Sequence, residues 1–253
     1  MYDSLLDVFA KYNLISGFAI IGVTMWIAYW FSDVFTKGRI HGSTIAIIIG
    51  LALAYISGVF TGGEKGVMDI PLLAGVGVIG GSMLRDFCII ATGFGVKIDE
   101  LKRAGKYGII ALFLGIFSSF FAGVLIALAF GYTDAVSLTT IGAGAVTYIV
   151  GPVTGSALGA SSEVIALSIT AGLVKSILVM VVTPFIAKYI GLDNPRSVVI
   201  FGGLMGTSSG VAAGLAATDP KLVPYGCLTA AFYTALGCLM APSVLFIMVR
   251  SVV

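Results

Sequence analysis

The sequence predicts an all-α, polytopic transmembrane protein, and its bulk composition supports that prediction. Of the 253 residues, 58% are hydrophobic and only 10% are charged, and the mean hydropathy is +1.10. A soluble domain carries about 25% charged residues, so this chain lacks the polar side chains needed to cover itself in water. The sequence shows none of the short alternating segments of a transmembrane barrel. A net charge of +2 gives no sign of a nucleic-acid partner.

Eight apolar segments approach the roughly 20 residues that a spanning helix needs. The third contains Arg85 and Asp86, the fourth has no charge, and the fifth is interrupted by Gly151 and Pro152. We divide the chain into an N-terminal half of four spans, residues 1–130, and a C-terminal half, residues 131–253, with broken or re-entrant segments at 139–162 and 197–218. The eight segments are 14–31, 43–60, 70–96, 107–130, 139–162, 163–190, 197–218 and 222–249.

The distribution of Lys and Arg predicts the topology, because cytoplasmic loops are rich in both. The loop with Lys37 and the loop 97–106 are predicted inside and the N-terminus outside. The basic residues near position 190 are also expected inside, which requires segment 139–162 to enter and leave on the outer face. A re-entrant hairpin turning at Gly151-Pro152 satisfies this, since proline removes a helical donor. Segment 197–218 is either a broken span, which would relate segments two to four and six to eight as inverted repeats, or a second hairpin pointing at the first.

Two glycine-rich breaks interrupt these apolar segments. In residues 201–219, glycine recurs every fourth position around a Thr-Ser-Ser run, and residues 151–159 repeat the spacing. Such glycines either let helices pack closely or let the backbone unwind and present polar groups to a solute. The glycines are Gly202, Gly206, Gly210 and Gly214 in the later stretch and Gly151, Gly155 and Gly159 in the earlier one.

If the helices are broken, each break exposes N–H groups at a helix N-terminus, which favours a carboxylate. Carbonyl and hydroxyl oxygens at the same place suit sodium, a hard cation. We therefore predict substrate contacts from Thr154, Ser156, Thr207, Ser208, Ser209 and Lys175. We predict sodium contacts from Thr147, Gly151, Thr154, Gly206 and Ser208, and expect no other metal.

Lys175 lies about 18 Å into its segment at 1.5 Å per residue, near the bilayer centre. A charge at that depth is costly and usually marks a substrate or ion path. The alternative is a structural ion pair with Asp86 or Glu163. A hydrolase would need Ser208, in a GxSxG match, to use Lys175 as its base, because the only histidine is His41, in a loop. We expect no enzymatic activity.

Three segments carry a resemblance to a known family. They are LRDFCIIATGFGVKIDELKRAGKYG, AGAVTYIVGPVTGSALGASSEV and RSVVIFGGLMGTSSGVAAGLAATDP. In these segments, and over essentially its whole length, the chain resembles the M subunit of the two-subunit malonate:sodium symporter of the MadL/MadM type. The second half is more distantly similar to LrgB/CidB-type membrane proteins and the plant plastid glycolate/glycerate carrier.

The resemblance implies sodium-coupled uptake of malonate, with sodium as coupling ion and no further cofactor. It also implies a small L-type membrane subunit as partner and a place in the bacterial cytoplasmic (inner) membrane; a higher oligomer of the heterodimer stays open. The paired breaks and Lys175 themselves favour a secondary transporter, with alternating access by an elevator or a rocking movement. The alternative is an LrgB/CidB-like pore-forming or murein-hydrolase-regulating protein without a coupled substrate.

Overall fold

The computed structural model describes residues 8, 11–38, 40–62, 69–70, 73–76 and 98–253. These residues form helices joined by turns, and no strand occurs among them. The chain divides into two compact units, Met1–Ala91 and Thr92–Val253, which we describe separately. The predicted all-α, polytopic membrane fold is confirmed.

Five helices in the described residues are long and apolar enough to cross a membrane. They match the first, second, fourth, sixth and eighth predicted segments. The third predicted segment, with Arg85 and Asp86, lies almost entirely outside the described residues. The five spans are Asn13–Phe35, Thr44–Thr61, Gly105–Ala129, Ser162–Ile186 and Pro220–Arg250.

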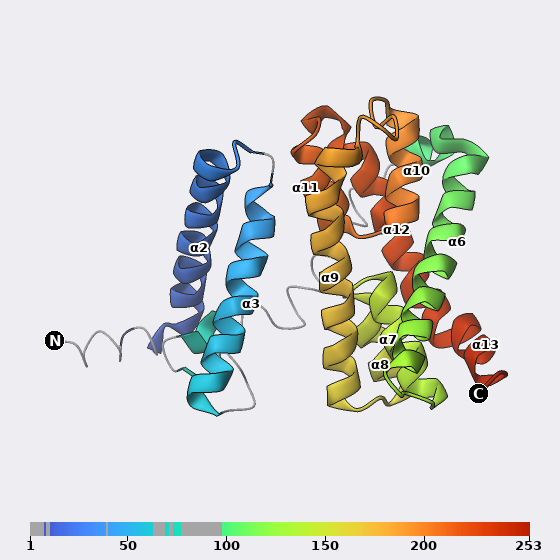
Figure 1. Ribbon diagram of the computed structural model, residues 1–253, viewed down its shortest axis with the longest axis horizontal. Helices are drawn as coiled ribbons and strands as arrows, with labels where there is room; N and C mark the ends of the chain where they lie inside the picture. The colour runs from blue at the N-terminus through green and yellow to red at the C-terminus, as the bar shows by residue number, and fades with distance from the viewer. Residues whose placement is uncertain (1–7, 9–10, 39, 63–68, 71–72, 77–97) are drawn as a thin grey trace. The chain divides into compact units, whose positions relative to one another are not determined.

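The first unit contains two of these spans, α2 (Asn13–Phe35) and α3 (Gly42–Thr61), which pack side by side (Figure 1). Their sequences lack a pronounced polar face, as expected for helices surrounded by lipid or by other apolar helices. The turn between them brings Gly42 against the ring of Tyr29, where an added Cβ would meet ring carbons 2.5–2.8 Å away. Glycine at this position therefore allows the close approach of α2 and α3.

Three long elements frame the second unit. Helix α6 (Ile98–Ala129) bends at Gly105, whose φ of 62° leaves the helical region, and its apolar part begins there. Helix α9 (Ser162–Ile186) packs against elements other than α6, as described below. Helix α12 (Val223–Met240) follows the 3₁₀ turn η3 (Pro220–Leu222) and packs against α6. A π-helical turn, η4 (Ala241–Leu245), links α12 to the terminal α13 (Phe246–Arg250).

The fifth predicted segment forms a helical hairpin, made of α7 (Ala135–Val146) and α8 (Val150–Leu158). With 12 and 9 residues, they are at most about 18 Å long, too short for the roughly 30 Å hydrocarbon core. They run antiparallel, because Gly151 faces Gly144 and Gly155 faces Thr140. The predicted hairpin is therefore present.

The predicted turn of that hairpin at Gly151-Pro152 is wrong. The chain turns at residues 147–149, and Pro152 lies in the first turn of α8. Proline is tolerated there because the first N–H groups of a helix have no intrahelical acceptor to lose. Gly151 serves packing, since an added Cβ would meet the Ser168 side chain of α9 at 2.5 Å.

The seventh predicted segment is also a hairpin, built from α10 (Pro195–Met205) and α11 (Ser208–Ala216). Along α10, Gly202 contacts Gly226 and the later Gly206 contacts Tyr233. Since both pairs follow the same chain direction, α10 runs parallel to α12. Helix α11 turns back along α9, where Gly210 meets Ser176. Of the two versions left open by the sequence, the second hairpin is therefore correct, and the broken span is excluded.

The two hairpins enter the second unit from opposite ends. In Figure 1, α7 and α8 lie at the lower end of α9, and α10 and α11 lie at its upper end. Each hairpin has its own hydrophobic core, with Leu138 and Val150 in one and Val198 and Leu215 in the other. Helix α6 with its following hairpin and α9 with its following hairpin thus run in opposite directions. The inverted repeat of segments two to four and six to eight required a spanning segment seven and is not supported.

Candidate functional site

The tip of the α7–α8 hairpin, residues 147–149, is organised by Thr147. Its backbone is extended, with φ −153° and ψ 156°, and its side chain is buried. Thr147 Oγ1 accepts hydrogen bonds from the N–H groups of Ile149 at 3.3 Å and Val150 at 3.2 Å. One threonine therefore ends α7 and caps the start of α8, as capping hydroxyls do.

The tip of the α10–α11 hairpin, residues 206–207, uses a glycine and a threonine. Gly206 ends α10 with φ 65°, a left-handed conformation that favours glycine. Thr207 caps α11, accepting the N–H of Gly210 at 3.4 Å. Its Oγ1 also lies 2.5 Å from Ser176 Oγ of α9. The predicted break near Thr207 is thus confirmed and is attached to α9 by a buried hydroxyl pair.

Lys175 lies on α9 beside Ser176, at the level where both tips end. Its ammonium donates three hydrogen bonds, to Val146 O at 2.9 Å, Ser119 Oγ at 2.9 Å and Tyr233 OH at 3.2 Å. These acceptors come from α7, α6 and α12, so Lys175 joins four helices. The Val146 carbonyl is the last of α7, where the helix dipole favours a cation.

Tyr233 continues this network towards the second hairpin. It is fully buried, and its hydroxyl donates to Gly115 O of α6 at 2.9 Å. Its ring lies against Gly206, so that an added Cβ there would overlap ring carbons. Tyr233 therefore touches both the ammonium and the tip of the α10–α11 hairpin.

The tips also contact each other directly. Tyr148 OH donates to Ser209 Oγ at 3.5 Å, a long bond that spans from one hairpin to the other. Tyr148 also packs against Gly172, one turn before Ser176 on α9. The two breaks recognised in the sequence therefore converge on a single region at the middle of α9.

The predicted contact residues divide into those at this region and those away from it. Thr147, Gly206 and Thr207 lie at the tips, and Lys175 lies beside them. Ser208 and Ser209 are the first two residues of α11, and Gly151 is the second residue of α8. Thr154, one turn further along α8, is fully buried. Ser156 is exposed near the far end of α8, away from the tips.

Thr154 has a hydroxyl that the fold leaves unused. Among the described residues, its Oγ1 is the buried side-chain oxygen or nitrogen found without a hydrogen-bond partner. Leaving such a group unpaired costs about 1–3 kcal/mol, so its retention needs a reason. A ligand oxygen or ion at this hydroxyl would provide one.

The alternative partners of Lys175 can now be assessed. Glu163 is exposed at the first turn of α9 and lies 12 positions before Lys175 on the same helix, so the pair is not formed. Asp86 lies outside the described residues. None of the three acceptors of the ammonium is a carboxylate.

Three residues of the network were not among the predicted contacts: Ser119, Ser176 and Tyr233. Ser119 belongs to the run FSSFF within a charge-free span, which on a single sequence reads as ordinary packing. Ser176 directly follows Lys175, and that adjacency was an available signal. Tyr233 lies in an apolar span, where a tyrosine gives only a weak signal for a site, because the groups that it contacts belong to helices distant in sequence.

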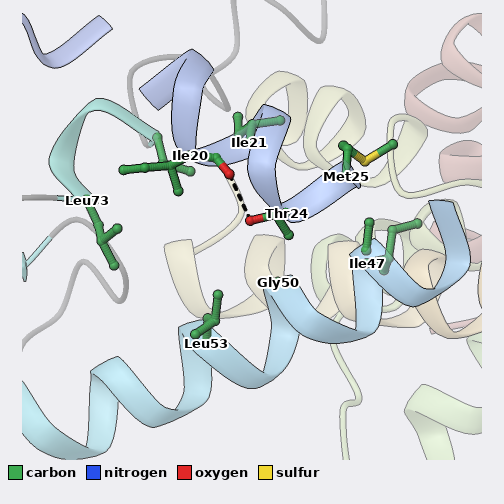
Figure 2. Close-up of a pocket in the computed structure, with 10 residues that line it drawn as sticks. Ile20, Ile21, Thr24, Met25, Ile47, Gly50, Leu53 and Leu73 are labelled. Atoms are coloured by element: carbon green, nitrogen blue, oxygen red, sulfur yellow. Dashed lines mark hydrogen bonds between the residues drawn. The ribbon is translucent and has the colours of Figure 1, made fainter. Parts of the chain in front are cut away.

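Two other candidate sites fit less well. A pocket of about 330 Å³ between α2 and α3 is lined by apolar side chains such as Ile20 and Leu53 (Figure 2). Among the described residues that line it, Thr24 is the one with a hydroxyl, and its Oγ1 already donates to Ile20 O at 2.9 Å, so these residues offer no free donor to a carboxylate. A hydrolase site would need Lys175 to meet Ser208, but its ammonium is bound to other groups.

Together, the apolar spans and the two opposed hairpins with polar tips define a polytopic membrane protein with a buried polar centre. Comparison with protein families then gives a specific assignment. The family described as malonate/sodium symporter MadM subunit matches residues 5–253, nearly the whole chain. The chain therefore belongs to the MadM family of membrane transport subunits, as the resemblance in the sequence predicted. Searches among curated proteins and solved structures gave no match.

Proposed function

We propose that this chain is the subunit that binds malonate and sodium in a bacterial sodium-coupled malonate importer, and that both bind where the hairpin tips meet. The family description supports symport of malonate with sodium by a carrier of more than one subunit. The observation that supports the location is the convergence of two capped helix breaks on Lys175 and Ser176. The further steps concern how this region would bind a dicarboxylate.

The start of α11 supplies hydrogen-bond donors for a carboxylate. The first N–H groups of a helix have no intrahelical acceptor, and the helix dipole favours an anion there. In α11 these are the N–H groups of Ser208 and Ser209, next to their own partly exposed hydroxyls. The start of α8 adds no donor of this kind, because the N–H groups of Val150 and Gly151 already bond to Thr147 and Pro152 has no N–H.

The charge balance also suits a dicarboxylate with a cation. Lys175 contributes one positive charge that no carboxylate among its partners neutralises. A doubly charged malonate needs more than one positive charge, and a sodium ion supplies the remainder. Hydroxyl and carbonyl oxygens at Thr147, Thr154 and Gly206 are the hard ligands that sodium prefers.

The proposed carrier works with a small L-type membrane subunit in the cytoplasmic membrane, with the N-terminus outside. The LrgB/CidB-like pore is not favoured, because the family description names a symporter. The decisive difference is concentrative uptake, since a pore cannot move a solute against its gradient.

Labelled malonate uptake into proteoliposomes tests the proposal, with this chain and its partner together and with each alone. We expect accumulation above the external concentration only with an inward sodium gradient. Equal internal and external malonate, with or without sodium, would refute the symport mechanism and favour the pore.

Thr154→Val tests the site itself, since valine keeps the shape of threonine and removes the unpaired hydroxyl. If Oγ1 binds substrate or sodium, the variant should be as stable as the parent or up to about 1–3 kcal/mol more stable, yet transport less. Thermal unfolding in detergent and the sodium dependence of uptake measure the two effects. Ser156→Ala, at an exposed position on the same helix, is the matched control. Unchanged sodium and malonate dependence in Thr154→Val would remove Thr154 from the site.

A further inference from the structure

One of the three acceptors of the Lys175 ammonium is a backbone carbonyl, whereas the other two are side-chain hydroxyls. Val146 O is the last carbonyl of α7 and lies directly before the tip residue Thr147. The carbonyls of a final helical turn lack intrahelical donors, and in the membrane interior no bulk water replaces them. A cation at this carbonyl therefore satisfies the end of α7 and balances its dipole.

The remaining hydrogen bonds of the ammonium hold it in place. Ser119 Oγ on α6 and Tyr233 OH on α12 take the other two donors. A lysine ammonium has three donors, so all of them are directed at protein oxygens. A carboxylate can contact Nζ only by displacing one of these bonds.

We infer that Lys175 is a positioning residue: its ammonium fixes the tip of the α7–α8 hairpin through Val146, while other groups contact the solute. The role of Lys175 in transport rests on the proposed function, whereas its contacts with Val146, Ser119 and Tyr233 do not. The α10–α11 tip is positioned by the same group indirectly, because Tyr233 touches both Lys175 and Gly206. Removing the charge should therefore loosen one tip first, not weaken solute binding alone.

Cysteine labelling of the tip tests this in the full chain, reconstituted with its partner. Ile149, buried at the tip, is replaced by cysteine after the three native cysteines have been replaced by serine. In the Lys175→Met background, we expect the rate of labelling by a water-soluble thiol reagent to rise roughly tenfold or more, the effect of losing one hydrogen bond to a charged group.

A second reporter separates loosening of the tip from general destabilisation. Val198→Cys, buried in α10, belongs to the other hairpin and should label at the parental rate. A similar increase in the labelling rate at both cysteines, or no increase at Ile149→Cys, would overturn the inference. Labelling needs no malonate, so its result stands even if sodium-coupled uptake is not found.

A milder variant keeps the test decisive if Lys175→Met does not fold. Ser119→Ala removes one acceptor of the ammonium, and we expect a smaller rise at Ile149→Cys with none at Val198→Cys. Ser243→Ala is the matched control, because that exposed hydroxyl donates to Leu239 O and Met240 O in its own helical segment. Equal labelling in Ser119→Ala and Ser243→Ala would contradict a role for the network in holding the tip.

Discussion

Replacing Gly206 by alanine perturbs the tip of the α10–α11 hairpin in two separable ways. Its φ of 65° places it in the left-handed region, which costs a residue with a Cβ about 1–2 kcal/mol. The new methyl group would also overlap the ring of Tyr233, a fully buried side chain with little room to move. Overpacking of this kind costs about 1–3 kcal/mol. We expect Gly206→Ala to destabilise the protein by about 2–5 kcal/mol, summing the two effects.

Gly191 provides a control with the same backbone conformation and no neighbour. Its φ is also 65°, but an added Cβ would meet no atom of the described residues within 4 Å, so Gly191→Ala should cost only the backbone strain of about 1–2 kcal/mol. The assay compares the fraction of each variant that stays monodisperse on size-exclusion chromatography after heating in detergent. Equal losses in the two variants would show that Tyr233 does not pack against the tip as described.

Two capping residues give further predictions. Thr207→Ala removes both the cap of α11 and the partner of Ser176, so it should cost about 1–3 kcal/mol, whereas Thr207→Ser should retain most of the stability; thermal unfolding that does not distinguish them would argue against the hydroxyl pair. Asp134 accepts the Ser137 N–H at 2.8 Å at the start of α7, so Asp134→Ala should cost about 1 kcal/mol near neutral pH. Burial raises the pKa of Asp134, but hydrogen bonds from Ser137 and adjacent backbone groups outweigh it and leave the pKa below its ordinary 3.8. Its stabilisation is therefore complete above the unfolded pKa and is lost as the pH falls through the folded pKa; a cost of Asp134→Ala that persists in acid would contradict this.

Much of the membrane architecture follows from the sequence because the bilayer imposes lengths and hydropathy. Segments such as 107–130 and 163–190 are apolar and long, and no soluble alternative competes with a spanning helix. The hairpin at 139–162 was predicted from charge placement together with the interruption at Gly151-Pro152. The position of its turn was not, because Pro152 disrupts a helix interior but is well tolerated in a first turn, and propensity does not say which case applies.

The glycines spaced four residues apart show why a binding role and a packing role could not be distinguished from the sequence. Gly202, Gly210 and Gly214 let α10 and α11 approach α12 and α9, as close-packing glycines do. Gly206, which has the same spacing, ends a helix. The packing interpretation thus applies to the first three glycines and the helix break to Gly206, and only tertiary contacts distinguish the two cases. The partners of Lys175 could not be predicted from the sequence either, because Ser119, Val146 and Tyr233 come from three other helices.

The order in which the chain is made has a bearing on how the two hairpins can fold. The α7–α8 hairpin depends on Lys175 and Tyr233, which lie 29 and 87 positions after Val146 and are synthesised later. The α10–α11 hairpin depends on Ser176 of α9, which precedes it, but also on Gly226 and Tyr233 of α12, which follow it. Backbone groups at membrane depth need partners, so the earlier hairpin can settle only after the last long helix has arrived. Both hairpins thus reach their final contacts only after α12 has been made, and we expect the polar centre to form late in folding.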